Sequence, residues 1–576
     1  MNKEVIIGID LGTTNSVVSY VKDGRPKIVP IDGEQTMPSC VGLTPDGKLI
    51  VGREARNQYT VYPERTVLSI KRKMGLDCTV PIGDQQFRPE EISALILKKL
   101  KAAAEAHIGS PIAKAVITVP AYFDEKQRKA TRDAGEIAGL NVVNVLNEPT
   151  AAALAYNSLS EADDTALVYD LGGGTFDASL VVNQAGVIEV KSSHGDTQLG
   201  GDDFDQLLMR RANDAFMQEG APSALEDSIS RSRLKMTMEA AKIELSSEPF
   251  VNVEEAFLLD GKSLQVEISR EDYQNEIYPL LEKTIGCCAQ CLNDAGMKAS
   301  DLNRILLVGG SSRTPLIYEM LQHRFNATIS HEINSDLVVA YGAGLQAASI
   351  AGIEKSSILV DITPHNLGVL ALDGYGRPTF STLIPRNSPL PARQAKVFFT
   401  VVDNQEAANV EVFQGGHETL DENKRIGELK VTGLSPLPEG NEIVVNFQLN
   451  LNGMLELTAT ERKTGLAKKT LIDTHGKGTQ LDIEATSLRL NTLAGTDEVS
   501  AAPTGADGSV VEVAEPVAAL RKRANLILSD ATLDADDRTE INEYLAKLEA
   551  TNAESNRDEF EQLKSGLEDV LFFLEQ

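Results

Sequence analysis

The sequence predicts a multidomain protein in which an α/β part comes first, an antiparallel β-sandwich follows and a small α-helical bundle ends the chain. Three observations support this fold class. The chain has 576 residues, which is too long for a single domain. Residues 1–352 alternate strand-like runs with amphipathic helical stretches, whereas residues 362–475 contain only strand-like runs and turns. Helical periodicity without strands then returns over residues 516–576.

Composition and charge argue against several classes of protein. The 55 lysine and arginine residues against 84 aspartate and glutamate residues give a formal net charge of −29, which disfavours a surface for nucleic acid or anionic lipid. The first apolar run is too short for a signal peptide, and no stretch reaches the length of a membrane span. Five cysteines at uneven spacings do not form a disulfide framework. We therefore expect a cytoplasmic protein.

The α/β part shows its alternation in one well-marked strand and helix. The run 114-KAVITV-119 is typical of a strand, and the helical pattern 124-DEKQRKATRDAGEIAGL-140 follows it. Asp124 can cap this helix, Gln127 stands at the capping-box position, and Gly139 can end it. A strand followed by a capped helix is the repeating element of α/β architecture.

The β part contains a hairpin signal. In 446-NFQLNLNGMLELTAT-460, two alternating runs flank Asn452-Gly453, a pair that tolerates the positive φ angles of a tight hairpin turn. No long helical pattern occurs over residues 362–475. This part therefore reads as a compact β domain.

The end of the chain changes character twice. Residues 494-AGTDEVSAAPTGADGS-509 are small and polar, which predicts a flexible segment. Two helical patterns follow, each with apolar side chains on one face. These side chains are Ile541, Tyr544, Leu545 and Leu548 in the first pattern, and Phe560, Leu563, Leu567, Val570, Leu571 and Leu574 in the second. We expect a small helical bundle here.

A short aspartate–glycine pattern occurs twice in the α/β part, in 6-IIGIDLGTTNSVVSY-20 and in 168-VYDLGGGTFDASL-180. Each copy predicts a hairpin whose turn offers backbone N–H groups and threonine hydroxyls, which are the groups that a polyphosphate needs. The acids suit a Mg²⁺ ion lying between them and the phosphates. One copy alone could be an ordinary tight turn. Because Asp10 and Asp170 lie 160 residues apart in matching contexts, the two copies predict a duplicated lobe with a cleft between them.

Other motifs carry less weight. The sequence contains no Walker A pattern and no GxGxxG, so a P-loop or Rossmann site is disfavoured. Cys288-Ala-Gln-Cys291 has CxxC spacing, but it lies in an amphipathic helical pattern and no second CxxC partners it. Packing on the buried face of a helix is therefore favoured over a zinc site. The seven histidines are scattered and show no ligand-like spacing.

Several motifs closely resemble the seventy-kilodalton heat-shock chaperone family, the DnaK-like proteins. They recur in the order of the family over the first 350 residues, and together they are highly specific. They are 8-GIDLGTTNS-16, 119-VPAYF-123, 147-NEPTAAALAY-156, 169-YDLGGGTFD-177, 199-LGGDDFD-205 and 309-GGSSRTP-315. The β part also matches, with 363-TP-364 and 403-DNQ-405.

The resemblance implies a domain layout and a set of ligands. The layout comprises an actin-like ATPase domain (1–352), an interdomain linker (353–361), a peptide-binding β-sandwich (362–475), a flexible segment (476–515) and a helical lid (516–576). The implied activity is that of an ATP-dependent chaperone, with ATP or ADP, Mg²⁺ and, as a further candidate, K⁺ as cofactors. The implied partners are unfolded apolar peptide segments, a J-domain co-chaperone and a nucleotide-exchange factor.

The family's nucleotide site carries over onto this sequence residue by residue. The resemblance implies that Asp10 and Asp170 hold Mg²⁺ through its waters, and that Lys71 stabilises charge on the γ-phosphate and orients the attacking water. The implied catalytic set is Lys71, Asp10, Glu148, Thr175 and Asp177. The implied phosphate loops contain Gly12, Thr13, Thr14, Asn15, Gly173, Gly174 and Thr175. The implied adenosine pocket contains Glu239, Lys242, Ser246, Gly310, Ser311, Arg313 and Asp336.

The resemblance also implies a peptide site in the β part. The pocket positions are Val369, Phe398, Ala408 and Val410, and the residues that arch over the peptide are Leu372 and Val401. From periodicity alone these residues would be assigned to a plain sandwich core. Ala408 is smaller and Val401 larger than is usual in the family, which predicts a reshaped pocket with an altered peptide preference.

Some positions depart from the family pattern. In the linker, Ile358 to Asp361 fit, but Ser356 and Ser357 do not. Asn144 stands where the family often has an arginine that is used in coupling to J-domain proteins, so stimulation by a standard J-domain protein is in doubt. The chain is also shorter than general members between Lys71 and Pro120. These departures suggest a specialised bacterial homologue of the HscC type.

Two other functions use the same actin-like fold. One is a small-molecule kinase, which would need a general base beside a sugar or acid pocket, and the other is a filament-forming actin homologue. Both leave residues 362–576 unexplained, whereas a chaperone uses them. The β part after an apolar linker therefore favours the chaperone.

Overall fold

The computed structural model of the chain describes residues 5–158, 163–330, 333–353, 358–417, 419–451, 453–471 and 482–493, together with residues 538, 541, 545 and 547. The described residues up to 493 belong to one compact unit, Met1–Asp497. Ser356, Ser357 and the turn residue Asn452 lie outside the described residues. So does nearly all of the segment for which the sequence predicts a helical lid.

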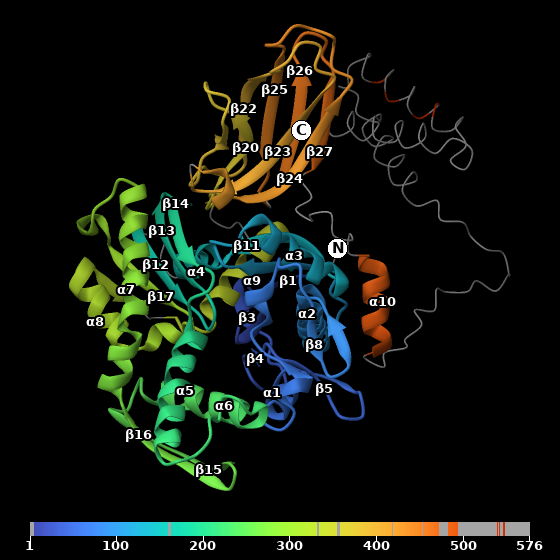
Figure 1. Ribbon diagram of the computed structural model, residues 1–576. Coiled ribbons are helices and arrows are strands. Elements are labelled where there is room, and N and C mark those ends of the chain that lie inside the picture. Colours follow the sequence, from blue (N-terminus) through green and yellow to red (C-terminus); the bar gives the residue numbers. More distant parts are fainter. Residues whose placement is uncertain are drawn as a thin grey trace, which may run out of the picture. The chain divides into compact units, whose positions relative to one another are not determined.

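The first sheet of the α/β part has the order β11-β10-β1-β2-β3, with the short β4 beside β2. Figure 1 labels its strands β1, β3, β4 and β11. Its central hairpin is antiparallel, whereas β1, β10 and β11 run parallel. The strands are β1 (Ile6–Leu11), β2 (Asn15–Lys22), β3 (Arg25–Ile28), β4 (Met37–Pro38), β10 (Lys114–Val119) and β11 (Asn141–Asn147). The first aspartate–glycine turn joins β1 to β2.

The second sheet repeats this connectivity with the order β18-β17-β12-β13-β14-β19. Two antiparallel hairpins come first, and β17 and β18 then add in parallel, as β10 and β11 do in the first sheet. The strands are β12 (Asp164–Leu171), β13 (Phe176–Gln184), β14 (Val187–Asp196), β17 (Arg304–Val308), β18 (Thr328–Ser330) and β19 (Ile358–Val360). The shared order is what a duplicated lobe requires, and the second aspartate–glycine turn joins β12 to β13.

Helices α4 (Glu148–Asn157) and α9 (Val338–Ile350) join the two sheets. Their alanine-rich faces share one hydrophobic cluster with strands of both sheets. Small residues are required where they cross, because a Cβ at Gly342 would lie 1.7 Å from the carbonyl oxygen of Ala151. A Cβ at Gly8 would lie 2.2 Å from the backbone of Ala343, so α9 also packs directly onto β1. The two halves are therefore joined by closely packed backbones.

Other helices cover the sheets from the outside. Helices α2 (Pro89–Ile108) and α3 (Glu125–Ile137) share a core with the first sheet, and α7 (Arg270–Asp294) shares one with the second. The capping prediction for α3 is confirmed: Asp124 accepts the Gln127 N–H at 3.0 Å, and the Gln127 side chain accepts the Asp124 N–H at 3.0 Å. Gly139 follows with a φ of 74°, as a residue that ends a helix often does.

The remaining elements of the α/β part are short or form insertions. The helices are α1 (Arg53–Gln58), α5 (Gly201–Gln218), α6 (Ser228–Glu244) and α8 (Pro315–Phe325). The strands are β5 (Val41–Leu43), β6 (Leu49–Val51), β7 (Thr66–Val67), β8 (Val80–Ile82), β9 (Gln85–Phe87), β15 (Phe250–Leu259) and β16 (Lys262–Ser269). The 3₁₀ turns include η2 (Ile70–Lys73) and η4 (Gly310–Arg313).

Two four-stranded antiparallel sheets form a sandwich, which we call the β-domain (residues 366–471), with orders β21-β20-β23-β24 and β22-β25-β26-β27. The strands are β20 (Asn366–Leu372), β21 (Pro378–Ile384), β22 (Ala392–Phe399), β23 (Ala407–Gly415), β24 (Lys424–Thr432), β25 (Glu442–Leu449), β26 (Leu455–Glu461) and β27 (Ala467–Leu471). Alternating side chains of both sheets form its core. The hairpin predicted around Asn452-Gly453 is confirmed, because β25 and β26 pair antiparallel and Gly453 has a φ of 76°.

Two segments connect the β-domain with the α/β part. Strand β19 lies in parallel register with β14 and pairs Ile358 with Val187. After the β-domain, helix α10 (Ile483–Leu493) packs on α2 and α3, with Leu490 fully buried in their core. This helix lies inside the segment for which the sequence predicts flexibility. Ile483 and Leu493 pack beside Leu490, and Arg489 forms an ion pair with Glu91 of α2.

Among the described residues, no helix is both long enough and apolar enough to cross a bilayer.

Candidate functional site

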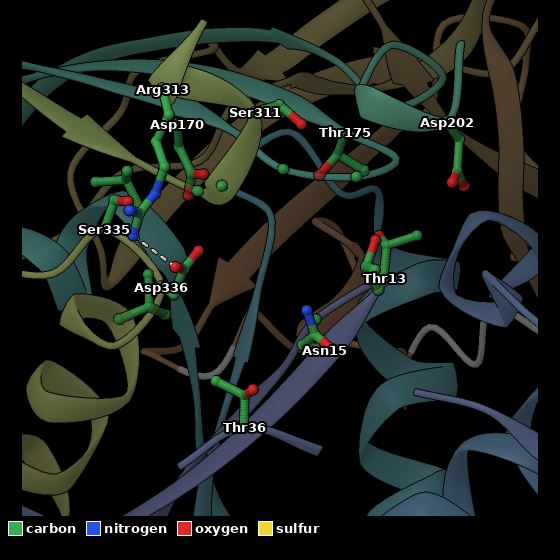
Figure 2. Close-up of a pocket in the computed structure, with 18 of the residues that line it drawn as sticks. Thr13, Asn15, Thr36, Asp170, Thr175, Asp202, Ser311, Arg313, Ser335 and Asp336 are labelled. Carbon is green, nitrogen blue, oxygen red and sulfur yellow. Dashed lines mark hydrogen bonds and ion pairs between the residues drawn. The ribbon is translucent and has the colours of Figure 1, made fainter. Parts of the chain in front are cut away.

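A cavity of about 420 Å³ lies where the two aspartate–glycine turns meet. Figure 2 shows side chains from both halves of the α/β part around it, among them Thr13 and Asn15 from one half and Asp170 and Thr175 from the other. Most of the residues predicted for the nucleotide site line this cavity. They are Asp10, Gly12, Thr13, Thr14, Asn15, Lys71, Glu148, Asp170, Gly173, Thr175, Glu239, Lys242, Ser246, Gly310, Ser311, Arg313 and Asp336. Of the predicted set, Gly174 and Asp177 do not line it.

The two turns touch each other, and this contact explains part of the glycine pattern. A Cβ at Gly173 would lie 2.0 Å from the Thr14 hydroxyl oxygen, and one at Gly174 would lie 2.7 Å from the Thr13 methyl carbon. Either atom would force the turns apart. The glycines therefore serve close packing between the two turns, in addition to leaving backbone N–H groups open to the cavity.

A buried group of acids lies beside the turns. Burial raises the pKa of Asp10 to about 7, and the nearby Glu148 carboxylate adds to this effect. Burial and Glu148 also raise the pKa of Asp170 well above its usual range. Among the described residues no three acid, histidine or cysteine side chains converge as a metal-ligand set. Carboxylates that are costly to ionise fit a hard cation that keeps most of its water, such as Mg²⁺.

Lys71 is the cation closest to this acidic group. It lies in η2 with only 4% of its side chain exposed, and its ammonium forms an ion pair with Glu148, the first residue of α4. A buried lysine held by one carboxylate is a fixed positive charge at the edge of the cavity. Such a charge can stabilise negative charge that develops on a phosphate.

Asp177 is held from behind the second turn. Its carboxylate accepts the N–H groups of Ala121 and Tyr122, both at 3.1 Å, and it stands opposite Asp170 in the β12–β13 register. Burial and the Glu148 carboxylate raise the pKa of Asp177 to about 7. Asp177 therefore lies beside the acids of the cavity but not in its wall.

Three cation–carboxylate pairs include residues that line the cavity. Lys242 pairs with the buried Asp205 at 2.7 Å, and burial raises the pKa of Asp205 to about 6. Arg313 pairs with Asp336 at 2.6 Å, as the dashed line in Figure 2 marks. Arg56 reaches from the first half of the α/β part to Glu239 on α6 at 2.8 Å.

Several residues of the cavity wall were not predicted from the sequence. Thr36, Asp202, Asp205, Ile243 and Ser335 also line it. Asp202 and Asp205 carried a signal, because both lie in the motif 199-LGGDDFD-205. Arg56 and Thr36 carried none, since each reaches the site only through tertiary packing.

The residues predicted for peptide binding form a buried group and an exposed group in the β-domain. Val369 and Val410 are buried in its core, and Phe398 and Ala408 are half-buried against the same cluster. Leu372 and Val401 are 49% and 57% exposed. The structure thus gives four side chains in one apolar cluster and two exposed apolar side chains at strand ends.

Hydrogen bonds join the linker acid Asp361 to the residues on either side of Glu148. Asp361 accepts hydrogen bonds from the Asn147 amide at 3.0 Å and the Thr150 hydroxyl at 3.2 Å, and Asn147 directly precedes Glu148. Arg128 holds the other end of the Asn147 amide at 2.6 Å. A change at the linker can therefore be transmitted to Glu148 through one residue.

The cysteine pair is structural, as the helical pattern predicts. Cys288 and Cys291 lie buried on the inner face of α7, and Cys291 donates to the Ala178 carbonyl at 3.1 Å. Burial raises the pKa of both thiols. In the described part of the chain they belong to no candidate metal cluster.

Comparison with known protein families gives one match. A family model described as "Hsp70 protein" matches residues 6–82 and 76–574, and these two ranges together include essentially the whole chain.

Proposed function

The chain belongs to the Hsp70 family, and from this premise we propose that it is an ATP-hydrolysing chaperone that binds and releases exposed apolar segments of unfolded proteins. The observation that supports this proposal best is the pair of touching glycine–threonine turns beside a buried group of acids and one buried lysine. That combination suits a polyphosphate with a divalent cation.

We assign the nucleotide site to the cavity between the two turns. In this assignment Asp10 and Asp170 would hold Mg²⁺ through its waters, and the Mg²⁺ would neutralise phosphate charge. The N–H groups of Thr13, Thr14 and Gly173 would bind the phosphates. The adenosine lies at the end formed by Glu239, Lys242, Ser246, Gly310, Ser311, Arg313 and Asp336. Gly12, Asn15, Gly174 and Thr175 complete the loops.

Hydrolysis in this site depends mainly on position and charge. Lys71 is fixed by Glu148, so its ammonium can stabilise charge on the γ-phosphate without first reorganising. Glu148 orients both the lysine and water, and Thr175 and Asp177 position the second turn. K⁺ is a further candidate ion beside these acids.

We place peptide binding in the β-domain, with Val369, Phe398, Ala408 and Val410 as the pocket and Leu372 and Val401 as the arch. Exposed apolar side chains beside an apolar cluster suit a short extended apolar segment. The small Ala408 and the larger Val401 predict a peptide preference that differs from that of a general chaperone of this family. A peptide array read with both proteins tests this, and identical profiles would reject it.

We further propose the domain layout and setting that the family resemblance implies. The ATPase domain is residues 1–352, the linker 353–361, the peptide-binding domain 362–475, the flexible segment 476–515 and the lid 516–576. The partners of the protein are unfolded clients, a J-domain co-chaperone and a nucleotide-exchange factor. It acts in the cytoplasm on neither nucleic acid nor membranes, as a specialised homologue of the HscC type.

The test compares ATP turnover with and without an unfolded apolar peptide. A chaperone of this kind hydrolyses ATP slowly alone and faster with peptide, and it releases the peptide on binding ATP. Turnover that requires a sugar or a small acid and ignores peptide would instead identify the small-molecule kinase.

A further inference from the structure

The ring of Tyr122 contacts two imidazoles that come from distant parts of the chain. Tyr122 follows β10 and precedes α3. His194 on β14 stacks on its ring with centroids 5.3 Å apart and an interplanar angle of 25°. His365, just before β20 of the β-domain, meets the ring at 4.5 Å and 64°. The Tyr122 ring thus contacts His194 of the α/β part and His365, which lies just before the β-domain.

The two imidazoles have different polar contacts. The Nε2 atom of His365 lies 3.1 Å from the Tyr122 carbonyl oxygen, so the neutral ring donates there. In the described part of the chain, the buried Nδ1 of His194 has no hydrogen-bond partner. A proton added to that atom would therefore be buried without an acceptor, which is costly.

The charged groups around each ring form one ion pair, whose acid and base act on the imidazole in opposite directions. Arg386 and Asp294 face His194, but they already form an ion pair at 2.9 Å. Asp124 and Lys424 face His365 and are likewise paired with each other at 2.5 Å. Burial, followed by Arg386, lowers the pKa of His194. Burial is the largest effect on His365 and lowers its pKa; the Tyr122 carbonyl and Asp124 oppose this effect, and Lys424 and His194 add to it.

The same tyrosine is connected to the nucleotide cavity through its backbone. The Tyr122 N–H and the Ala121 N–H hold the two oxygens of Asp177, each at 3.1 Å. The carbonyl of Tyr122 contacts His365. A shift of Tyr122 would therefore reach Asp177, which stands opposite Asp170 in the sheet.

We propose that His194 and His365 form a proton-sensitive clamp on Tyr122 that holds the β-domain against the α/β part while both imidazoles are neutral and releases it when they are protonated. Each histidine is neutral in the clamped form and regains its ordinary pKa of about 6.5 when released. Its contribution to clamping is therefore complete above pH 6.5 or so and is lost as the pH falls below that value. Any effect on ATP hydrolysis rests on the proposed function, but the clamp itself does not.

Two carboxyl groups near the same contact act in the opposite direction. Burial raises the pKa of Glu125 to about 7 and also raises the pKa of Asp361. Both carboxyl groups are easier to keep buried at low pH, so they favour the clamped form as the pH falls. The overall pH dependence of clamping therefore mixes both signs, and substitution must isolate the histidine contribution.

The experiment measures hydrogen exchange of the β19 amides in the full chain at pH 7.5 and 5.5. Each β19 exchange rate is divided by the exchange rate of the β12 amides in the same sample, which removes the intrinsic pH dependence of exchange. Wild type is compared with His194→Asn, with His365→Gln and with the double variant. We expect the ratio of wild-type to variant clamping constants to fall by up to about tenfold per histidine between the two pH values. The exposed His323→Gln on α8 is the matched control and should leave the ratio at one.

A second measurement does not depend on how well the variants fold. Imidazole resonances of the wild-type protein give the two pKa values directly, and we expect both to lie below the ordinary histidine value of about 6.5. Ordinary values for both histidines, or a pH-independent ratio in the exchange experiment, would overturn the clamp. A protein that shows the clamp but hydrolyses no ATP would reject the proposed function alone.

Discussion

At the scale of single residues, the buried ion pair of Lys71 and Glu148 sets the chemistry of the cavity. We predict that Lys71→Met lowers the rate of single-turnover ATP hydrolysis by about 10²–10³-fold, because a fixed charge aimed at the phosphates is lost. Nucleotide affinity should change only a few-fold, since the remaining contacts persist. Lys73→Met, at an exposed position two residues further on, should leave the rate unchanged. Unaltered hydrolysis in the Lys71 variant would remove Lys71 from the catalytic set.

The buried acids make a second prediction at this scale. Asp10 and Asp177 each have a pKa of about 7, so both are partly protonated near neutral pH. A cation placed beside them favours the ionised form, and binding of Mg²⁺ with ATP should therefore release protons. We expect about one proton per nucleotide near pH 6.5 and almost none above pH 8.5. Titration calorimetry in buffers of different ionisation enthalpy measures this, and heats that do not depend on the buffer at pH 6.5 would contradict it.

At the scale of elements, the contact between the two turns limits what the glycines can become. We predict that Gly173→Ala lowers stability by about 1–3 kcal/mol, because its Cβ would lie 2.0 Å from the Thr14 hydroxyl. Thermal unfolding without nucleotide measures this directly. Gly172→Ala is the matched control, since a Cβ there meets nothing closer than 3.8 Å. Adding Thr14→Ala to the Gly173 variant should restore part of the loss, and no recovery would place the strain elsewhere.

The linker strand gives another prediction for an element. Asp361→Ala removes the acceptor of the Asn147 and Thr150 hydrogen bonds. Losing these buried bonds costs about 1–3 kcal/mol, so exchange of the β19 amides should speed up by about tenfold or more. Asp421→Ala, at an exposed acid of the β-domain, should have no such effect. Equal exchange in both variants would show that Asp361 does not hold the strand.

At the scale of the whole molecule, the contacts between the two parts predict coupling between their ligands. If ATP weakens peptide binding by some factor, peptide must weaken ATP binding by the same factor. For a coupling of about 1–3 kcal/mol the factor is about 5–150-fold. The Lys71→Met variant allows both affinities to be measured without turnover. A factor of one in both directions would mean that the two parts act independently.

Local patterns in the sequence predicted the α/β part, the β-domain that follows it and the two aspartate–glycine turns, whereas most other residues of the cavity wall were predicted through the family resemblance. Strand and helix periods mark elements, and a repeated Asp-Leu-Gly turn marks a repeated lobe. The features of the site that the sequence did not predict depend on contacts between distant segments. Arg56 meets Glu239 only after the halves close on each other. Asp177 turns away from the cavity because two backbone N–H groups capture it.

The same limit applies to the segment after the β-domain and to the histidines. The sequence did not predict α10, because the small polar residues around residue 500 indicate a flexible segment. The helix is stabilised by the burial of Leu490 against α2 and α3 rather than by a strong helical pattern of its own. His194 and His365 show no spacing that relates them, because a single tyrosine from a third segment brings them together.

The pairing of β19 with β14 has a consequence for solubility. Val187 to Glu189 pair with Ile358 to Val360, so the short β19 and not β14 forms this edge of the second sheet while the linker stays in place. When the linker leaves, the edge presents unpaired N–H and C=O groups that any extended chain can use. Glu189 and Lys191 then become the charged residues on that margin, and they are what discourages strands of other molecules from adding to it.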